Sequence, residues 1–438
     1  MAFLQFASLG HAIFLSCLAI HCLFGASVFW IATQYLRCRE HALAEEGRLL
    51  KLALPPDAEL PQILIQLPTF NEGALIARIA GSVQTLDWPH DRLYVQVLDD
   101  STDGSVAHSQ KAAVSLRESG IAAEVVLRGH RAGFKAGALA EGLRRSDAMF
   151  VAILDADYMP EPDFLRACMR PMLNDANLGF VQARCDYLNA DENDVTYAQQ
   201  RILDAHFAVE QAARNWSGQL MPFNGTCGIW RRAAIDDAGG WQGDTLAEDL
   251  DLSYRAQLRG WRALFLSTIT VKGELPGSVG VWRQQQFRWT KGFAEAGRKL
   301  LWPLWCSRLA LGQKIASTLH LGGGMLGPLF VVTFLTGLID FTIGYGPTWA
   351  SLSLLALSLL GGAIVGPAIL MLTGQIMARS STLSFELPRL PRVIGMQLLN
   401  GLANLGGAMD ALLGRATAFE RTPKSAEDGL QAHYAPRT

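Results

Sequence analysis

An ordered series of acidic motifs, followed by long apolar sequence, constrains this chain of 438 residues more than any other feature. Asp99-Asp100 and Asp155-Ala156-Asp157 each follow an apolar run, and Glu248-Asp249 comes later in the chain. The polar motif from Gln285 to Trp289 then stands directly before the apolar part. This order predicts an acid-rich globular domain that works at a membrane surface.

Short β-rich runs alternate with helical ones from about Arg37 to about Leu301, which is typical of an α/β fold with a mostly parallel sheet. The near-continuous hydrophobicity of these runs suits strands that are covered on both faces. Five strands are expected, at Ile63 to Leu67, Leu93 to Leu98, Glu124 to Leu127, Met149 to Leu154 and Phe180 to Ala183. Ligands bind beyond the carboxyl ends of such strands, where the first two acidic motifs fall.

A charge-free segment near the start of the chain predicts a transmembrane helix over residues 1–36. The stretch from Ala12 to Leu36 has no charged side chain and is long enough to cross a bilayer of about 30 Å. Arg37 and Arg39 follow it, which places its carboxyl end in the cytosol. A cleaved signal peptide is the alternative, but the apolar run is too long and no basic residue precedes it.

Residues 302–392 are expected to hold about two further transmembrane helices. Only His320 interrupts the uncharged sequence between Lys314 and Asp340, and no charge occurs between Asp340 and Arg379. Two crossings would return the chain to the cytosolic side. An amphipathic helix in the membrane interface is favoured over a full span for residues 393–418, because Asn400, Asn404, Asp410 and glycines dilute its apolar residues.

Polar turns end the first two expected strands. Thr69, Asn71 and Glu72 follow the first strand, and Asp100 follows the second. Asx and Ser/Thr turns explain either motif alone. Two acidic strand ends together suggest a nucleotide pocket, in which carboxylates accept hydrogen bonds from base and ribose.

The motif Asp155-Ala156-Asp157 is weak in isolation but gains meaning from its place at a strand end. Two carboxylates there can offer oxygens to a hard divalent cation, Mg²⁺ or Mn²⁺, which would neutralise charge on a diphosphate leaving group. The basic, glycine-containing loop from Arg131 to Gly137 could bring Lys135 to a phosphate. The alternative is a loop that only caps a helix, and the motif lacks the spacing of a P-loop.

Glu248 and Asp249 open an expected helix. Thr245 and Glu248 have the spacing of a capping box, and Asp249 would then lie in the first turn, where the helix dipole holds it ionised. An ionised carboxylate is what a general base must be.

Gln285, Arg288 and Trp289 share one face if their segment is helical. The indole could stack on a sugar ring, with the other two side chains on phosphate oxygens or hydroxyls. An interfacial aromatic flanked by snorkelling cations is the alternative explanation. Asn224, Gly225 and Thr226 match a glycosylation acceptor pattern, but a cytosolic domain would not meet that machinery. We expect these three residues to form a tight turn that lines an acceptor path.

The bulk composition excludes some classes. A formal net charge of -2 argues against a nucleic-acid binder, because tracking phosphates needs a dense positive field. The seven cysteines lack CxxC pairs, so they are expected to be reduced thiols rather than a disulfide framework or a zinc site.

Taken together, these residues resemble the family 2 membrane glycosyltransferases of the cellulose synthase superfamily. The similarity covers roughly residues 60 to 300. It is strongest to plant cellulose-synthase-like A and bacterial mannan synthases, through the segments Phe223 to Thr226, Trp230-Arg231, Glu248 to Leu252, Glu274-Leu275-Pro276 and Gln285 to Trp289.

The resemblance implies a GT-A type nucleotide-sugar-binding domain and a role for each motif. Asp249 would be the base, and the metal diphosphate would lie on Asp155 and Asp157. The residues expected to contact the nucleotide or the diphosphate are Thr69, Asn71, Glu72, Asp100, Lys135, Gln285 and Arg288. The acceptor would contact Asn224, Gly225, Thr226, Glu248 and Trp289.

The end of the chain also resembles a gating loop of bacterial cellulose synthase. Phe419, Thr422 and Lys424 match that loop, and Arg421 departs from it. Residues 419–438 would then form a cytosolic lid segment and tail. The expected domains are therefore 1–36, a glycosyltransferase domain over 37–301 that ends in the interfacial helix with Gln285, and the segments 302–392, 393–418 and 419–438.

The leading hypothesis is an inner-membrane, multi-pass inverting glycosyltransferase with its catalytic domain in the cytosol. It would transfer a hexose from GDP-mannose or UDP-glucose to a β-linked mannan or glucan. Transfer of one or a few sugars to a diacylglycerol or ceramide is the first alternative, and a non-catalytic nucleotide-binding membrane scaffold is the second. An accessory subunit or a homo-oligomer is left open.

Overall fold

The computed structural model describes residues 2–343, 349–358 and 364–415, which form two compact units. The sheet unit comprises Glu40–Tyr197 and Leu220–Trp282. The described part of the helical unit lies within Met1–Arg39, Ala198–Gln219 and Arg283–Thr417. The predicted lid residues Phe419, Thr422 and Lys424 lie outside the described residues.

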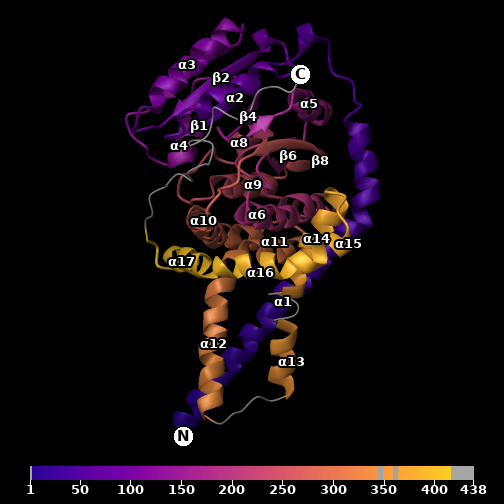
Figure 1. Cartoon of the computed structure of the whole chain (residues 1–438), viewed down its shortest axis with the longest axis vertical. Coiled ribbons are helices and arrows are strands. Elements are labelled where there is room, and N and C mark those ends of the chain that lie inside the picture. The colour runs from indigo at the N-terminus through magenta and orange to yellow at the C-terminus, as the bar shows by residue number, and fades with distance from the viewer. Residues whose placement is uncertain (1, 344–348, 359–363, 416–438) are drawn as a thin grey trace. The chain divides into compact units, whose positions relative to one another are not determined.

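A mixed sheet forms the centre of the sheet unit, and its eight strands within the described residues follow the order β3-β2-β1-β4-β7-β6-β8-β5 (Figure 1). Strand β7 is antiparallel to β4 and β6, and β5 is antiparallel to β8, whereas the other pairs are parallel. The predicted α/β fold with a mostly parallel sheet is confirmed. The strands are β1 (Ile63–Thr69), β2 (Leu93–Asp99), β3 (Ala122–Leu127), β4 (Phe150–Ile153), β5 (Met159–Pro160), β6 (Leu178–Tyr187), β7 (Gly228–Arg231) and β8 (Arg262–Gly273).

The five predicted strands correspond to β1, β2, β3, β4 and β6. These are the strands with apolar runs, and most residues of β1, β2 and β6 are buried. Strands β5, β7 and β8 were not predicted. The first two are very short, and β8 carries polar side chains on partly exposed positions, so packing in the sheet rather than local composition decides their conformation.

Amphipathic helices accompany the strands of the sheet unit. Helix α2 buries Leu75, Ile76, Ile79, Ala80 and Val83, which lie on one stripe of the helix. The helices of this unit are α2 (Leu75–Gln84), α3 (Ser105–Glu118), α4 (Phe134–Arg144), α5 (Phe164–Asn174), α8 (Arg232–Asp237), α9 (Glu248–Leu258), with short η1 (Asp57–Glu59) and η2 (His90–Arg92).

All seven cysteines lie among the described residues and are free. Cys168, Cys185 and Cys227 are buried in the sheet unit. Burial raises the pKa of the Cys227 thiol well above its ordinary value, so this side chain stays protonated at neutral pH.

The helical unit contains the apolar part of the chain. Its helices, some of which extend into residues of the sheet unit, are α1 (Ala2–Leu49), α6 (Asp194–Asp204), the π-helical turn η3 (Ala205–Glu210), α7 (Gln211–Trp216), α10 (Val279–Cys306), α11 (Leu311–Gly322), η4 (Gly323–Met325), α12 (Leu326–Ile343), α13 (Trp349–Ser358), α14 (Gly366–Ala378), α15 (Leu383–Glu386), η6 (Leu387–Arg389), α16 (Leu390–Leu399) and α17 (Gly401–Leu412).

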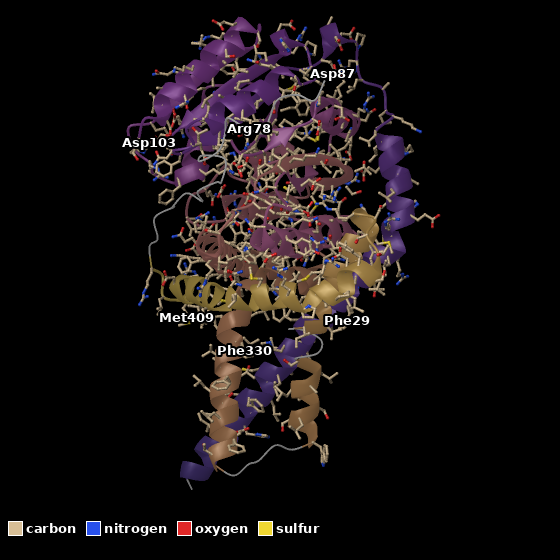
Figure 2. All side chains as sticks on the ribbon, viewed as in Figure 1. Phe29, Arg78, Asp87, Asp103, Phe330 and Met409 are labelled. Carbon is tan, nitrogen blue, oxygen red and sulfur yellow. The ribbon has the colours of Figure 1, made fainter. Side chains whose placement is uncertain are left out.

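Two helical segments of the described residues, Leu9–Leu49 and Leu311–Thr342, are long and apolar enough to cross a membrane. Their most apolar windows have mean hydropathies of 2.1 and 1.7. Large apolar side chains on them are exposed, such as Phe29 at 39% and Phe330 at 55% (Figure 2). This length, hydropathy and exposure indicate association with a membrane.

The remaining predicted membrane segments form shorter helices. The stretch between Asp340 and Arg379 contains α13 and α14, and α14 is apolar but shorter than a span. The predicted interfacial segment 393–418 includes most of α16 and all of α17. A third crossing and an interfacial position therefore stay predictions.

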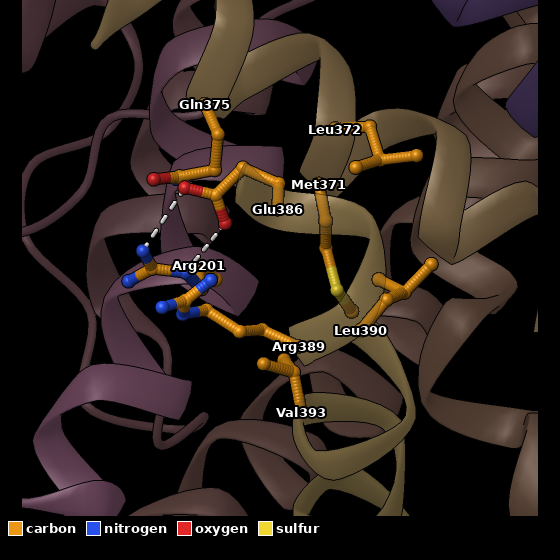
Figure 3. A pocket seen from close by; sticks show the side chains of 8 residues that line it. All are labelled: Arg201, Met371, Leu372, Gln375, Glu386, Arg389, Leu390 and Val393. Carbon is orange, nitrogen blue, oxygen red and sulfur yellow. Dashed lines mark hydrogen bonds and ion pairs between the residues drawn. The ribbon is translucent and has the colours of Figure 1, made fainter. Parts of the chain in front are cut away.

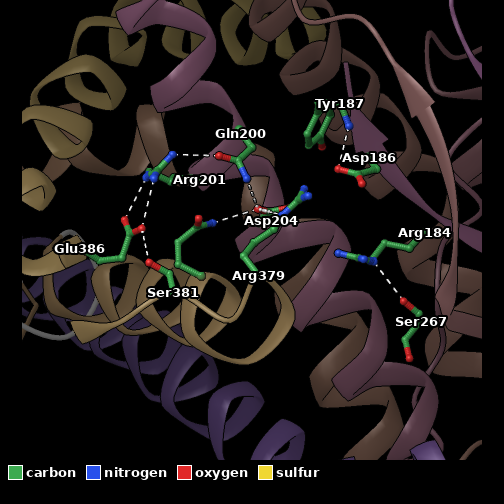
Figure 4. Close-up of polar contacts among 11 residues, drawn as sticks. Arg184, Asp186, Tyr187, Gln200, Arg201, Asp204, Ser267, Arg379, Ser381 and Glu386 are labelled. Carbon is green, nitrogen blue, oxygen red and sulfur yellow. Dashed lines mark hydrogen bonds and ion pairs between the residues drawn. The ribbon is translucent and has the colours of Figure 1, made fainter. Parts of the chain in front are cut away.

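A buried polar network joins α6 to α14 and α15 inside the helical unit (Figure 4). Asp204 is fully buried, and Arg379 donates two hydrogen bonds of 3.0 Å to its carboxylate. Gln375 donates to the same carboxylate at 2.9 Å. Arg201 forms a second, two-pronged pair with Glu386 at 3.0 and 3.1 Å. These ion pairs, of which Figure 3 shows Arg201 with Glu386, stabilise the contact of α6 with α14 and α15, because separating the helices would leave buried charges uncompensated.

Candidate active site

Asn71 joins the two loops that follow β1 and β2 in the sheet unit. It has a positive φ of 57°, and its backbone N–H donates to Ser101 Oγ at 2.8 Å. Its side-chain oxygen accepts a hydrogen bond of 2.9 Å from the N–H of Thr102. Thr69, two residues earlier, accepts a hydrogen bond of 3.1 Å from the N–H of Asp100 through its carbonyl oxygen. Thr69, Asn71 and Glu72 thus shape the strand ends, and their predicted contact with a nucleotide stays a prediction.

The adjacent aspartates Asp99 and Asp100 have different surroundings. Asp99 is buried and accepts hydrogen bonds from the N–H of Ser101 at 2.7 Å and from Ser109 Oγ at 2.5 Å. Asp100 instead receives two guanidinium hydrogen bonds from Arg128, of which Nε to Oδ1 measures 2.8 Å. Asp99 therefore holds the loop, and Asp100 is fixed in place by a cation that the sequence did not single out.

Arg128 also supports the basic loop that was predicted to approach a phosphate. Its guanidinium donates to the carbonyl oxygens of Ala132 at 3.0 Å and Phe134 at 2.9 Å. A Cβ on Gly137 would overlap the Ala132 carbonyl oxygen, so only glycine fits where the loop enters α4. Arg128 directly follows β3. Its position as a cation at a strand end is the only feature of the sequence from which its role could have been predicted.

Lys135 lies in the first turn of α4 and connects this helix to the end of β4. Its ammonium donates to Asp155 Oδ1 at 2.5 Å and to the carbonyl oxygen of Gly225 at 2.9 Å. The backbone N–H of Asp155 donates to Thr226 Oγ1 at 2.9 Å. The structure therefore brings together four of the predicted site residues, Lys135, Asp155, Gly225 and Thr226.

The loop from Asn224 to Cys227 is a tight turn, as predicted. Gly225 and Cys227 have positive φ angles of 74° and 61°. Gln182 on β6 is completely buried and fastens the turn: its Oε1 accepts from the N–H of Asn224 at 3.0 Å, and its Nε2 donates to the Thr226 carbonyl oxygen at 3.0 Å. The sequence did not identify Gln182, because nothing local marks a polar side chain in the middle of a strand as a brace.

Asp249 lies against this turn. A Cβ built on Gly225 would be 2.9 Å from Asp249 Oδ2 and 3.3 Å from Lys135 Nζ, so the backbone of Gly225 is in close contact with both charged groups. A side chain at this position would push the carboxylate away. Glycine is therefore required both by its backbone conformation and by the space that Asp249 occupies.

The predicted capping box at the start of α9 is wrong. The helix begins at Glu248 with Ala247 as its N-cap, and no side chain caps it. Thr245 is buried and lies outside the cap position. Asp249 is in the first turn, as predicted, and its Oδ1 accepts from the N–H of Leu250 at 2.8 Å. The buried loop before the helix, rather than the Thr-to-Glu spacing, decides where α9 starts.

The charged groups of the site shift one another's pKa values. Burial raises the pKa of Glu248 to about 8, helped by the neighbouring Asp249. Burial also raises the pKa of Asp249 to about 6, against the lowering effect of Lys135 and of the backbone N–H groups. Burial alone would lower the pKa of Lys135, but Asp155, Glu248 and Asp249 raise it above its ordinary value. Burial thus opposes the expected effect of the helix dipole on Asp249, but a pKa of about 6 still leaves this carboxylate ionised at neutral pH.

Two carboxylates at the end of β4 have the chemistry of a divalent-cation site. Asp155 and Asp157 follow β4 directly, and hard oxygen ligands suit Mg²⁺ or Mn²⁺. In the described part of the chain, no three His, Cys, Asp or Glu side chains are grouped to hold a metal by themselves. A cation at this pair would need further oxygens from water or from a bound phosphate, which is usual for Mg²⁺.

The segment Glu274-Leu275-Pro276 follows β8 and is held to the sheet unit by a buried ion pair. Arg78 of α2 donates to Glu274, and both side chains are largely buried. Asn189 holds the next residue, because its Oδ1 accepts from the N–H of Leu275 at 2.8 Å. This motif is thus a structural support in the sheet unit.

Gln285, Arg288 and Trp289 lie on α10, which confirms that they occupy one face of a helix. They belong to the helical unit, whereas the carboxylates and Lys135 belong to the sheet unit. The indole of Trp289 is partly exposed. Their contact with donor or acceptor stays a prediction.

Comparison with known proteins identifies relatives. The model of the family "Glycosyltransferase like family 2" matches residues 61–292, which is more than half of the chain. Glucomannan 4-beta-mannosyltransferase 2 from Arabidopsis thaliana is 44% identical over 248 residues, 56% of this chain and 46% of the relative. Glucomannan 4-beta-mannosyltransferase 1 from Oryza sativa subsp. japonica is 42% identical over 245 residues, 55% of this chain and 47% of the relative. The chain thus spans about half the length of the curated relatives it matches.

A solved structure shares the fold. It is a mannosyltransferase from Pyrobaculum calidifontis in complex with GDP-Man and Mn²⁺, with a TM-score of 0.55 and 19% sequence identity. The match covers 90% of this chain and all of that one. At this level of identity the likeness supports the GT-A glycosyltransferase fold alone.

Proposed function

The chain belongs to glycosyltransferase family 2, and on that premise we propose that it is a membrane-bound inverting hexosyltransferase that extends a β-linked glycan. GDP-mannose is the favoured donor, because the matched relatives are named glucomannan mannosyltransferases and the solved mannosyltransferase was bound to GDP-Man. A mannan-type polysaccharide is the favoured product.

One observation supports this proposal above the others: the close contact of Asp249, Gly225 and Lys135, with Asp155 held by the same lysine. The residues proposed as general base and as phosphate-binding cation, together with a second carboxylate, lie within one compact unit. Sugar transfer from a nucleotide sugar needs a base for the acceptor hydroxyl and positive charge for the departing diphosphate.

In the proposed reaction, Asp249 accepts the proton of an acceptor hydroxyl, whose oxygen attacks the anomeric carbon of the hexose. The bond from that carbon to the diphosphate oxygen breaks, and the nucleoside diphosphate leaves from the opposite face, so the anomeric configuration inverts. Because the pKa of Asp249 is raised to about 6, its carboxylate is ionised at neutral pH. This pKa is also close enough to pH 7 for the carboxylate to act as a general base. Lys135 would donate hydrogen bonds to the diphosphate.

A divalent cation, when bound, would be held by Asp155 and Asp157 and would neutralise part of the charge on the diphosphate. Asp100 would contact the nucleotide, with Arg128 fixing the orientation of its carboxylate. Asn224 and Thr226 would line the acceptor path beside Gly225, together with Glu248.

Further contacts are proposed from the family motif on α10. Gln285 and Arg288 would bind the diphosphate, and Trp289 would stack on the acceptor sugar. Phe419, Thr422 and Lys424 would belong to a lid segment. We further propose a multi-pass protein of the inner membrane with its sheet unit in the cytosol, consistent with the apolar helices Leu9–Leu49 and Leu311–Thr342.

Purified protein tested against a panel of nucleotide sugars, with release of nucleoside diphosphate as the readout, tests the donor. We expect release from GDP-mannose that requires Mg²⁺ or Mn²⁺. Release from UDP-glucose alone would change the donor. The absence of hydrolysis or transfer with every donor would favour the non-catalytic scaffold.

The acceptor is tested on the products of radiolabelled donor. Insoluble label that a β-mannanase releases would support a polysaccharide. Label that extracts into organic solvent would instead identify a diacylglycerol or ceramide acceptor, which the same site chemistry would allow.

A further inference from the structure

Two loops of the sheet unit meet backbone to backbone at Gly133 and Gly243. Gly133 belongs to the basic loop that leads into α4, and Gly243 lies in the loop between α8 and α9, residues 238–247. A Cβ built on Gly243 would overlap the Cα atom of Gly133 and lie 3.0 Å from its carbonyl oxygen. Because these neighbouring atoms belong to the backbone, no side chain could move aside to make room.

The Gly133 side of this contact bears on Lys135. Gly133 is the N-cap of α4, and its carbonyl oxygen accepts a hydrogen bond of 2.9 Å from the N–H of Gly137. That hydrogen bond closes the first turn of α4, which carries Lys135. Pressure on the carbonyl oxygen would therefore displace this turn, and with it the ammonium that is bonded to Asp155 and Gly225.

The Gly243 side of the contact bears on Asp249. The first part of the loop is fixed to α9, because Arg255 donates to the carbonyl oxygens of Ala238 and Gly240, the latter at 2.9 Å. The second part runs from Gly243 to the start of α9, and Asp249 lies in the first turn of that helix. Since hydrogen bonds hold the first part, a displacement at Gly243 would pass to the start of α9.

The backbone conformation does not explain why residue 243 is a glycine. Its φ lies outside the left-handed region, so an alanine there would be free of backbone strain. The residue is also exposed, so burial does not limit the size of its side chain. The requirement for glycine comes from the approach of Gly133.

We propose that Gly243 is a positioning residue for the transfer reaction. Through Gly133 it sets the separation between the turn of Lys135, which binds the diphosphate, and the turn of the base Asp249. Gly225 contacts both charged groups directly, whereas Gly243 acts through the two loops that lead to them. Attack on the anomeric carbon requires donor and acceptor at a fixed separation. This role rests on the proposed function.

Titration calorimetry of GDP, or of UDP if the donor panel selects it, tests the coupling to Lys135 in the purified full chain in detergent with Mn²⁺. Gly243→Ala should weaken binding by about tenfold, because the displaced turn no longer aims the ammonium at the diphosphate. In a Lys135→Met background the same substitution should change the affinity little, since the cation through which it acts is gone. The stoichiometry of binding counts the folded molecules separately from their affinity.

Transfer from the nucleotide sugar tests the coupling to Asp249. Gly243→Ala should lower kcat by about tenfold or more per folded molecule, in addition to raising the KM for the donor. Gly129→Ala is the matched control, four residues before Gly133. Gly129 is exposed, its φ is also outside the left-handed region, and no atom lies within 4 Å of an added Cβ. This variant should keep both constants.

Equal affinities of Gly243→Ala and Gly129→Ala for the nucleoside diphosphate would overturn the proposal. The same loss of affinity from Gly243→Ala with and without Lys135 would also overturn it, as would an unchanged kcat in Gly243→Ala. These results would leave the proposed function intact, because the unmodified protein would still bind the nucleotide. Failure of the unmodified protein to bind GDP or UDP would instead contradict the proposed function, and with it this role of Gly243.

Discussion

The ammonium of Lys135 lies 2.5 Å from the carboxylate of Asp155, although one residue opens a helix and the other follows a strand. The same ammonium reaches the carbonyl oxygen of Gly225, against which Asp249 packs. Lys135 thus connects the predicted diphosphate site to the predicted base.

Replacing Asp249 by Asn should lower kcat by about 10²- to 10⁴-fold, because the amide cannot accept the proton of the acceptor hydroxyl. Nucleoside diphosphate release from GDP-mannose in detergent-solubilised protein measures the loss. Donor affinity, measured by titration calorimetry, should change little. Asp237→Asn, which alters an exposed carboxylate bonded to Arg259, is the control and should keep full activity. Retention of activity by Asp249→Asn would assign the base elsewhere.

Gly225→Ala should lower kcat by about tenfold or more, because the added methyl group would displace the Asp249 carboxylate by contact at 2.9 Å. Gly240→Ala is a matched control: its φ of 72° is close to the 74° of Gly225, and no atom lies within 4 Å of an added Cβ. Both variants should lose about 1–2 kcal/mol of stability from backbone strain. Equal activities of the two variants would contradict the steric role of Gly225.

The rate should depend on pH through Asp249. Its pKa is raised to about 6, so its ionised fraction, and with it kcat/KM, should rise as pH increases through 6 and then level off. Lys135 lowers this pKa, and Lys135→Met should therefore move the acidic limb of the profile to higher pH. The measurement is kcat/KM between pH 5 and 8 for both proteins. An unchanged limb in Lys135→Met would show that another group titrates.

Arg128→Lys should raise the KM for the nucleotide sugar by about tenfold, with a smaller effect on kcat. Lysine keeps the charge but cannot donate to both oxygens of Asp100 and also to the carbonyl oxygens of Ala132 and Phe134. Donor titrations at saturating acceptor separate the two constants. Arg117→Lys is the control, since Arg117 donates to the Ala123 carbonyl oxygen at an exposed position away from Asp100. A change in kcat alone would place Arg128 outside donor binding.

Asp251→Asn should destabilise the protein by about 3–5 kcal/mol, because it breaks a buried ion pair. Asp251 is fully buried and accepts from Arg255 at 2.7 Å. Thermal unfolding in detergent measures the effect, and residual activity per folded molecule should remain close to normal. Asp237→Asn, at an exposed pair that solvent screens, should shift the unfolding temperature far less. Equal effects would mean that the Asp251 pair adds nothing beyond a surface pair.

Features that depend on neighbouring residues can be predicted from the sequence. Local hydrophobicity predicts strands β1, β2, β3, β4 and β6 and the long apolar segments. Helical periodicity predicts the common face of Gln285, Arg288 and Trp289. The acidic residues at the strand ends could also be expected to lie at one edge of the sheet, because parallel strands place their carboxyl ends there. The short or half-polar strands β5, β7 and β8 could not be read, since pairing across the sheet decides them.

Which of these residues contact one another depends on the packing of segments that are distant in the chain. Arg128 and Asp100 are 28 residues apart, and Lys135 and Gly225 are 90 apart, so no local pattern could pair them. The start of α9 at Glu248, the brace from Gln182 and the raised pKa of Asp249 likewise depend on packing. A pattern along the chain reports only the burial of each segment. Contact and desolvation between charged side chains arise only when strand order and helix packing bring distant segments together.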